Sequence, residues 1–314
     1  MNHSGSLRTS RVAARLTNAF TLDLVKLGGY RRDVIDVLLR TALLHANQAH
    51  IIRDSELQRR YASLDDDVPD DLRRPASINA IAASLRVPFE TARRRIGGMA
   101  ELGVCQITPQ GVVVPGAVTN SPPYRAACAI QYDKVCDLYG RLKGIGLFDS
   151  LPAATPCNLA DPPLRLVGRL TVEYVLRFTE PISLHIGDVV TGLVLMDLIM
   201  ANTEHLPDAE AGTDQAGADG FVPDRLREPV PATALSRRLG VPQETVRRHL
   251  GRLLERDLCR KAAGGYLVPA EILGRGPFVQ FIIDNQAHLN RMFAGLGEFG
   301  VLAAWEQERQ RGAA

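Results

Sequence analysis

Apolar residues in the last third of the chain recur at two different spacings. In the stretch "PATALSRRLG", Leu235 and Leu239 lie four residues apart, which predicts a short helix over 231–240. Gly240 favours the end of that helix, because glycine readily adopts the left-handed conformation that follows a helix. The next stretch, "QETVRRHLGRLLERD", again has apolar residues at helical spacing and predicts a second helix over 243–257. The stretch "LCRKAAGGYLVP" then predicts two short strands around a Gly-Gly turn.

The same pattern occurs earlier in the chain. The stretches "SINAIAASL", "RVP", "FETARRRIGGMAELG" and "VCQITPQGVVVP" again predict helix, turn, helix and hairpin. Val87 and Val241 are 154 positions apart, and this offset holds through the flanking segments. Further upstream the offset is 155 positions, which aligns Asn47 with Asn202. The chain is therefore an internal duplication.

The duplication spans nearly the whole chain. Each copy covers about 135 residues, which is far longer than a solenoid repeat. We therefore predict two domains, over 9–148 and 164–307, joined by a linker at 149–163 that is rich in proline and small residues. The helix–turn–helix–hairpin segments are called the first head (72–115) and the second head (226–269).

The order helix, tight turn, helix, hairpin is that of a winged helix-turn-helix. The phrase "LGVPQETVRRHLGRLLERDL" resembles the recognition helix of bacterial regulators of the MarR/GntR-like kind, and the long helices around each head are also similar to MarR proteins. The resemblance implies a mainly α fold with two tandem winged helix-turn-helix domains, whose flanking helices form an intramolecular pseudo-dimer. MarR proteins are ordinarily dimers of one such unit, and this chain departs from them by carrying both units itself.

One face of the second helix in each head carries the residues that we expect to contact DNA. At about 100° per residue, this face lies opposite the apolar stripe. Arginine can bond guanine bidentately, and threonine can reach a thymine methyl or a phosphate. Glu90 and Glu244 are expected to favour the helix N-terminus or to pair with the arginine four residues on. With the helix flanks and the second wing included, the candidate DNA-binding residues are Thr91, Arg93, Arg94, Arg95, Thr245, Arg247, Arg248, Arg252, Arg260 and Lys261.

Positive charge is concentrated on the two heads. The whole chain has a formal net charge of +2, which says little about partners. The first head has six basic residues against two acidic ones, and the second has nine against four. Such a concentration is expected of a surface that binds phosphates. A cluster of arginines is often only a solvated helix face, but matching positions in both copies favour DNA contact.

The two heads also differ in sequence. The second has Arg252 where the first has Gly98, and its wing begins "CRKAAGG" where the first begins "CQITPQG" without a basic residue. Because the copies of a fused duplicate are free to diverge, the second head should make more phosphate contacts and depend more steeply on salt. The two half-sites should then differ, as in an imperfect palindrome.

Other residues are weaker candidates. We expect Cys105 and Cys259 to be small core residues rather than a paired thiol switch. Polar groups near the ends of two apolar helices could line an effector pocket, but satisfied helix-end groups are favoured; they are Asn47, His50, Asn202 and His205. Candidates for a ligand cavity by likeness to MarR proteins are Tyr30, Tyr124, Tyr132 and Tyr139. No catalytic motif is present, so we expect no enzyme, no cofactor and no metal.

Together these observations predict a cytoplasmic, sequence-specific DNA-binding transcriptional regulator. The longest apolar run, 189–201, is too short for a membrane span and is interrupted by Asp197, so it is expected to be a buried helix. We expect double-stranded DNA as the partner, a small-molecule effector as an optional one, no membrane, and either a monomeric pseudo-dimer or a homodimer. Two alternatives stay open: a plasmid-type replication initiator with two winged helices, and a winged-helix scaffold protein of a chromosome-segregation complex.

Overall fold

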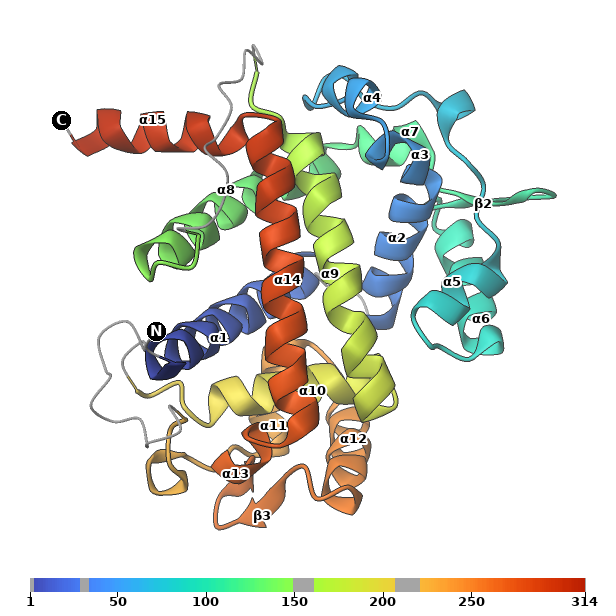
Figure 1. Ribbon diagram of the computed structural model, residues 1–314. Coiled ribbons are helices and arrows are strands. Elements are labelled where there is room, and N and C mark those ends of the chain that lie inside the picture. Colours follow the sequence, from blue (N-terminus) through green and yellow to red (C-terminus); the bar gives the residue numbers. More distant parts are fainter. Residues whose placement is uncertain (1–2, 29–33, 149–160, 207–220, 314) are drawn as a thin grey trace. The chain divides into compact units, whose positions relative to one another are not determined.

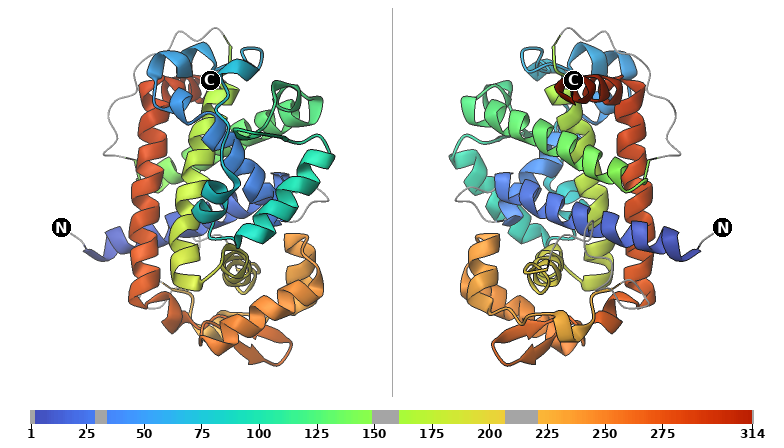
Figure 2. Two further views of the ribbon diagram at one scale, coloured as in Figure 1. Left: turned by 90° about the vertical axis from the view of Figure 1, so that its right-hand side faces the viewer. Right: turned by 90° about the vertical axis from the view of Figure 1, so that its left-hand side faces the viewer.

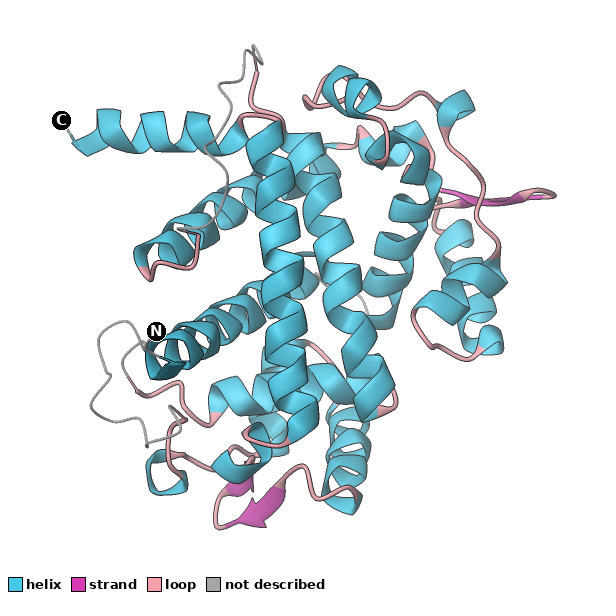
Figure 3. Ribbon diagram, viewed as in Figure 1, coloured by secondary structure: helices cyan, strands magenta, loops and turns pink. Residues whose placement is uncertain are grey.

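The computed structural model describes residues 3–28, 34–148, 161–206 and 221–313. These residues are mainly helical and include two small antiparallel hairpins (Figures 1 and 3). The prediction of a mainly α fold is confirmed. Tyr30 and most of the predicted linker lie outside the described residues.

The elements of the first repeat begin with two longer helices and end with another long one. In chain order they are α1 (His3–Gly28), α2 (Val34–Asn47), α3 (Ala49–Ile52), α4 (Ser55–Arg60), the 3-10 helix η1 (Asp70–Leu72), α5 (Ile78–Ser84), α6 (Phe89–Glu101), β1 (Gln106–Thr108), β2 (Gly111–Val113), α7 (Gly116–Thr119) and α8 (Pro122–Gly144). The first head therefore consists of α5, α6, β1 and β2 with the turn that precedes them.

The second repeat follows the same order of elements. They are α9 (Leu164–Ile186), α10 (Val189–Ala201), η3 (Asp224–Leu226), α11 (Ala232–Leu239), α12 (Gln243–Glu255), β3 (Arg260–Ala262), β4 (Gly265–Leu267), α13 (Ala270–Leu273), α14 (Gly276–Glu298) and α15 (Val301–Ala313). Apart from α3, α4 and α15, each described element of one repeat has a counterpart in the other. The duplication in the sequence is thus also a duplication of secondary structure.

Each head ends in a two-stranded antiparallel hairpin. In the first, β1 pairs with β2 with Gln106 opposite Val113, and in the second, β3 pairs with β4 with Arg260 opposite Leu267. A single bridge adds the segment before the first helix of each head to the hairpin, at Ala76 in one case and Val230 in the other. The predicted Gly-Gly hairpin lies where the sequence indicated.

The chain forms two compact units, and each combines segments of both repeats. Unit 1 comprises 1–35, 142–147 and 181–287, and unit 2 comprises 36–141, 148–180 and 288–314. Helix α1 of the first repeat therefore belongs to the unit that holds the second head, whereas most of α9 belongs to the unit that holds the first head. The predicted domain boundaries follow the repeat along the sequence and not these units.

Helix α10 is central to unit 1. Its residues from Val189 to Leu198 are buried, including Asp197, because α1, α11 and α12 all pack against it. Figure 2 shows α10 (yellow) end-on next to the orange helices of the second head. The predicted buried helix is confirmed, and no helix in the described part of the chain is long and apolar enough to cross a membrane.

An aromatic cluster forms part of the core of unit 2. The Tyr139 ring stacks on Phe148 with centroids 5.7 Å apart, and both rings contact Phe293. Trp305 is fully buried, and its Nε1 donates a hydrogen bond of 2.7 Å to the Tyr132 hydroxyl. Tyr132 and Tyr139, which the resemblance suggested for a ligand cavity, are therefore packing residues of unit 2.

The backbone turns sharply at equivalent points of the two heads. Gly240 follows α11 in the left-handed conformation with φ 65°, as predicted, but its counterpart after α5 is Arg86 with φ 52°. That conformation costs a residue with a side chain about 1–2 kcal/mol. After the next helix the roles are reversed, with Gly103 at φ 69° and Asp257 at φ 52°. The heads share one backbone path but place glycine at different turns.

Candidate nucleic-acid interface

The candidate residues lie on α6 and α12, whose starts are set by prolines. Pro88 and Pro242 are the N-cap residues of these helices. The sequence placed Pro242 at the first helical residue, and the structure places it one residue earlier. Its fixed φ still directs the chain into the helix there. The apolar stripe is buried as predicted, with Ala92, Ile96 and Met99 in α6 and Val246, Leu250 and Leu253 in α12.

An exposed arginine stands on the same face of each helix as a half-buried threonine. Thr91 and Arg94 lie three residues apart on α6, and Thr245 and Arg248 lie at the equivalent positions of α12. Within the described part of the chain, neither Arg94 nor Arg248 makes a hydrogen bond or an ion pair. Each guanidinium group therefore keeps its five N–H donors for an external partner.

The arginines one residue earlier are exposed but pair within their own helices. Arg93 donates to the Glu90 carboxylate from Nε and Nη2, at 2.9 and 2.6 Å. This hydrogen bond lowers the pKa of Glu90. Arg247 lies 3.7 Å from Glu244. Both glutamates lie in the first turn of their helices, as one of the two expectations had it. Their ion-pair partners are three residues on, so the alternative pairing with the arginine four residues on is wrong.

The opposite flank of each helix faces the second helix of its repeat. Arg95, which was predicted to contact DNA, is half-buried and forms an ion pair of 2.8 Å with Asp36 on α2. His249 is buried at the equivalent position, and its Nδ1 lies 2.7 Å from the Thr191 hydroxyl on α10. We therefore remove Arg95 from the candidate interface. Its ion pair ties α6 to α2, as the His249 contact ties α12 to α10.

The basic residues specific to the second head differ in whether they have an internal ion-pair partner. Arg252 donates to Asp188 at 2.9 Å, and Arg260 donates to Asp224 at 2.8 Å. Lys261 is exposed on β3 and has no ion-pair partner among the described residues. Of these three cations, Lys261 alone can bind a phosphate without giving up an internal pair.

Some arginines that contribute to the charge of the heads are not on the surface. Arg73 is 4% exposed and pairs with Asp67 at 2.8 Å, and Arg227 is 6% exposed. Arg238 forms an ion pair of 3.0 Å with the buried Asp197. The positive charge that the heads present is therefore smaller than the count along the sequence indicated. The count could not show this, because it does not distinguish buried from exposed arginines.

A buried asparagine holds each hairpin in place. Asn47 donates from Nδ2 to the carbonyl oxygens of Arg74 and Val112, at 2.7 and 3.0 Å, and accepts from the Val114 N–H at 2.9 Å. Asn202 makes the same three bonds in the second head, with Glu228, Tyr266 and Val268. The sequence favoured satisfied groups at these positions. It gave no sign that the groups they satisfy are backbone groups in and beside the hairpin.

The cysteines at the start of the wings are packing residues. Cys105 and Cys259 are buried, and each Sγ lies near a backbone carbonyl of the preceding helix. Burial raises the pKa of both thiols, that of Cys259 to about 11. A thiol with a raised pKa is a poor nucleophile at neutral pH. This agrees with the expected core role.

The candidate interface therefore reduces to the exposed faces of α6 and α12 and the second wing. Its residues, called the open set, are Thr91, Arg94, Thr245, Arg248 and Lys261. The remaining predicted cations take part in internal pairs. A scan against protein-family models found no match to the chain, and searches of curated proteins and of solved structures found none either.

Proposed function

We propose that the protein is a sequence-specific transcriptional regulator that binds double-stranded DNA through two winged helix-turn-helix heads. In this proposal α5 and α6, and likewise α11 and α12, are the helix-turn-helix pairs, and the hairpins are the wings. The observation that carries the proposal is the repeated pairing of a threonine with an exposed arginine, Thr91 with Arg94 and Thr245 with Arg248, on the second helix of each head. That is where a recognition helix meets base edges.

The neighbouring charges support DNA contact over a merely solvated face. On both helices the arginine beside the open one lies next to a glutamate, at Arg93 and Arg247, while Arg94 and Arg248 are left without such a partner among the described residues. The anchors at Arg95 and His249 fix the rotation of each helix about its own axis. A fixed rotation presents the same side chains every time, as base recognition requires.

Two heads in one chain suit a two-part operator. Since the heads carry different side chains around a shared framework, their half-sites would form an imperfect palindrome. The chain would act as its own pseudo-dimer, and a regulator of this kind would work in the cytoplasm.

The arginines provide the direct test. An operator would first be selected from a random DNA pool with the full chain. Arg94→Ala and Arg248→Ala should then each weaken operator binding by about 1–3 kcal/mol and relax the base preference of one half-site. Arg93→Ala and Arg247→Ala are the matched controls, and they should cost less because those guanidinium groups lie beside a glutamate.

The outcome separates three roles. Equal losses on operator and on random DNA would make the arginine a phosphate contact only. If neither Arg94→Ala nor Arg248→Ala changes binding, the proposed recognition face is wrong. Mapping of genomic occupancy then distinguishes the regulator, at a few promoters, from a replication initiator, at a single origin.

A further inference from the structure

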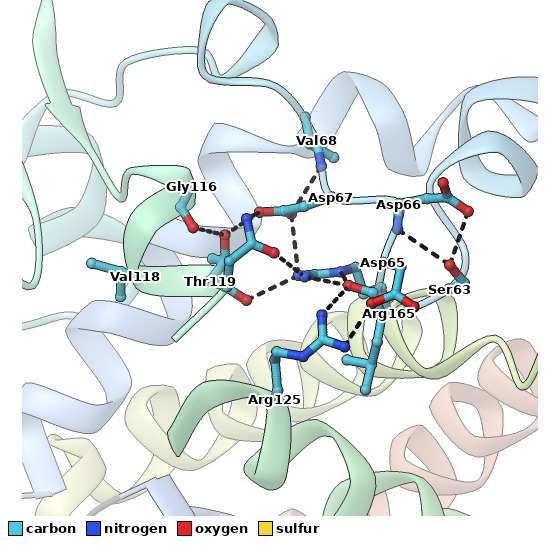
Figure 4. Close-up of polar contacts among 12 residues, drawn as sticks. Ser63, Asp65, Asp66, Asp67, Val68, Gly116, Val118, Thr119, Arg125 and Arg165 are labelled. Carbon is cyan, nitrogen blue, oxygen red and sulfur yellow. Dashed lines mark hydrogen bonds and ion pairs between the residues drawn. The ribbon is translucent and has the colours of Figure 1, made fainter. Parts of the chain in front are cut away.

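One carboxylate of the protein itself pairs with two buried arginines in unit 2. Asp67 lies between them, with its Oδ2 2.8 Å from Arg73 Nη2 and its Oδ1 3.1 Å from Arg165 Nη1. The Thr119 hydroxyl donates to the same carboxylate, and Asn120 donates to it from Nδ2 at 2.9 Å. Figure 4 shows Asp67, Thr119 and Arg165 in this cluster. Arg73 and Arg165, both buried in unit 2, therefore have an acid of the chain itself as a partner.

The second repeat keeps the arginines of this cluster and Asp224, the counterpart of Asp70, but loses the acid that lies between two arginines. At the repeat offset, "DVPD" at 67–70 aligns with "FVPD" at 221–224, so that Phe221 replaces Asp67. Thr119 and Asn120 are likewise replaced, by Leu273 and Gly274. The three arginines of unit 2 that are retained are Arg73, Arg165 and Arg169, whose counterparts are Arg227, Arg11 and Arg15. All of these counterparts lie in unit 1.

Unit 1 has a cavity among these counterparts. Its volume is about 350 Å³. Its described lining is mainly apolar and includes Phe221 and Leu273, with the basic residues Arg11, Arg15, Arg227, Arg275 and His185. No Asp or Glu is among the described residues that line it. The volume lies within the range of small-molecule sites, which are typically about 300–1,000 Å³. The cavity is thus apolar in most of its wall and basic in one part.

Arg227 has a buried N–H group without a partner in this cavity. It is 6% exposed, and its Nη1 has no hydrogen-bond partner among the described residues. Its Nε donates to the Val222 carbonyl at 2.9 Å. The nearest carboxylate in the described part of the chain, Asp224, is 3.9 Å from that Nε and is bound more closely by Arg260 and by the Ala270 N–H. Burial lowers the pKa of Arg227, so an anion beside it would offset part of that penalty.

We infer that unit 1 contains a binding site for an organic carboxylate with an apolar body. The ligand carboxylate binds the unpartnered Nη1 of Arg227, beside the Phe221 ring over which the Arg11 guanidinium lies, and the apolar body lies against Ile199 and Phe278. The first repeat fills the equivalent position with its own acid, so only one repeat binds the ligand. This inference does not rest on DNA binding.

The Asn18 side chain gives the ligand a further polar neighbour. Asn18 lines the same cavity, and its Oδ1 is buried without a hydrogen-bond partner in the described part of the chain. An amide can present either its oxygen or its nitrogen at such a position. It therefore suits a hydroxyl group on the ligand as well as the carboxylate itself.

The test is calorimetric titration of the full chain with two probes of equal length, decanoate and the neutral decan-1-ol. We expect decanoate to bind at least about tenfold more tightly, which is the effect of a hydrogen bond to a charged group. Phe221→Asp restores the acid of the first repeat and should weaken decanoate binding by at least about tenfold. Phe221→Leu keeps the cavity apolar and should retain the binding.

Three results would overturn the inference. The first is that decan-1-ol binds as tightly as decanoate. The second is that Phe221→Asp leaves the affinity for decanoate unchanged. The third is that neither decanoate nor a second carboxylate probe, 2-naphthoate, binds. Thermal unfolding of each variant checks that it is folded. If Phe221→Asp does not fold, Arg227→Gln decides: a tenfold or greater loss supports the site, and unchanged affinity overturns it. Arg53→Ala, at an exposed position of the other unit, is the control that should leave decanoate binding unaltered.

Discussion

In the first head an ion pair between Arg95 and Asp36 joins α6 to α2, and in the second a hydrogen bond between His249 and Thr191 joins α12 to α10. The positions are equivalent, but one contact is charged and the other is between a hydroxyl and an imidazole. Both fix the rotation of the helix that carries the open arginine. The duplication has therefore kept the role of the position while its chemistry has changed.

The surfaces of the heads have diverged less than the sequence indicated. Arg252 and Arg260 would make the second head more basic, but both lie in internal pairs with acids. Among the candidate residues, the remaining difference is on the second hairpin, where Lys261 lies at the position of Ile107, which is 53% exposed. We therefore expect a smaller contrast in DNA binding between the heads than a count of their cations gives.

The largest expected effect concerns the buried asparagine that both heads share. Asn47→Ala and Asn202→Ala each remove three hydrogen bonds and leave backbone groups in and beside the hairpin buried without partners. Each should lower the free energy of unfolding of its unit by about 3 kcal/mol. Urea denaturation followed by circular dichroism measures the loss, with the exposed Asn79→Ala as the control. Clearly unequal losses would show that the two anchors are not equivalent.

A smaller effect is expected at the turn between the two helices of each head. Arg86→Gly relieves a left-handed residue and should stabilise the first head by about 1 kcal/mol, whereas Gly240→Ala should destabilise the second by a similar amount. The two substitutions thus have opposite signs at equivalent positions, and the same denaturation experiment measures both. Loss of stability in Arg86→Gly would mean that the arginine side chain contributes more than its backbone conformation costs.

The helices and hairpins of the heads could be predicted from the sequence because their apolar residues recur at fixed local spacings. Val246, Leu250 and Leu253 are an example, and the same periodicity also placed Arg94 and Arg248 on the exposed side. Duplication strengthened these assignments, since each pattern occurs twice. Local spacing was sufficient wherever the partner of a residue lies within its own helix or hairpin.

The features that could not be predicted depend on residues far apart in the chain. Arg95 looked like its neighbours, but its partner Asp36 is 59 positions away. In the sequence, nothing distinguishes Arg73 from a surface cation, because its partner Asp67 is not recognisable as such. The packing of α1 in the same unit as the second head likewise has no local sequence signal. The replacement of Asp67 by Phe221 was visible in the sequence. Its consequence was not, because nothing local shows that Asp67 lies between buried arginines.

The wing gives a test of the remaining surface contrast. Exchanging the two residues, as Lys261→Ile and Ile107→Lys, should move one phosphate contact from the second head to the first. The slope of log affinity against log salt on each isolated half-site should change by about one unit, down for Lys261→Ile and up for Ile107→Lys. The change in binding free energy should stay below about 1 kcal/mol, as for other exposed ion pairs. Unchanged slopes would remove Lys261 from the open set.

The smallest expected effect comes from the different chemistry of the two helix anchors. Burial lowers the pKa of His249, assisted by Arg252 and Arg248 and opposed by Asp188, so the folded protein holds this histidine neutral. The unfolded chain binds its proton at the ordinary pKa of about 6.5. Unit 1 should therefore have its full stability above about pH 6.5 and lose stability as the pH falls below that value, because the unfolded state then binds more protons.

Arg95, the counterpart of His249 in the first head, stays charged throughout this range and gives no such dependence. His45 and His50 also have pKa values lowered by burial, so the dependence must be assigned by difference. In His249→Gln the free energy of unfolding should vary less between about pH 5 and pH 8 than in the wild type, whereas the exposed His185→Gln should leave the variation unchanged. If His249→Gln has the same pH dependence as the wild type, the anchor of the second head is not a neutral histidine. The contrast between a charged and a neutral anchor would then have to be abandoned.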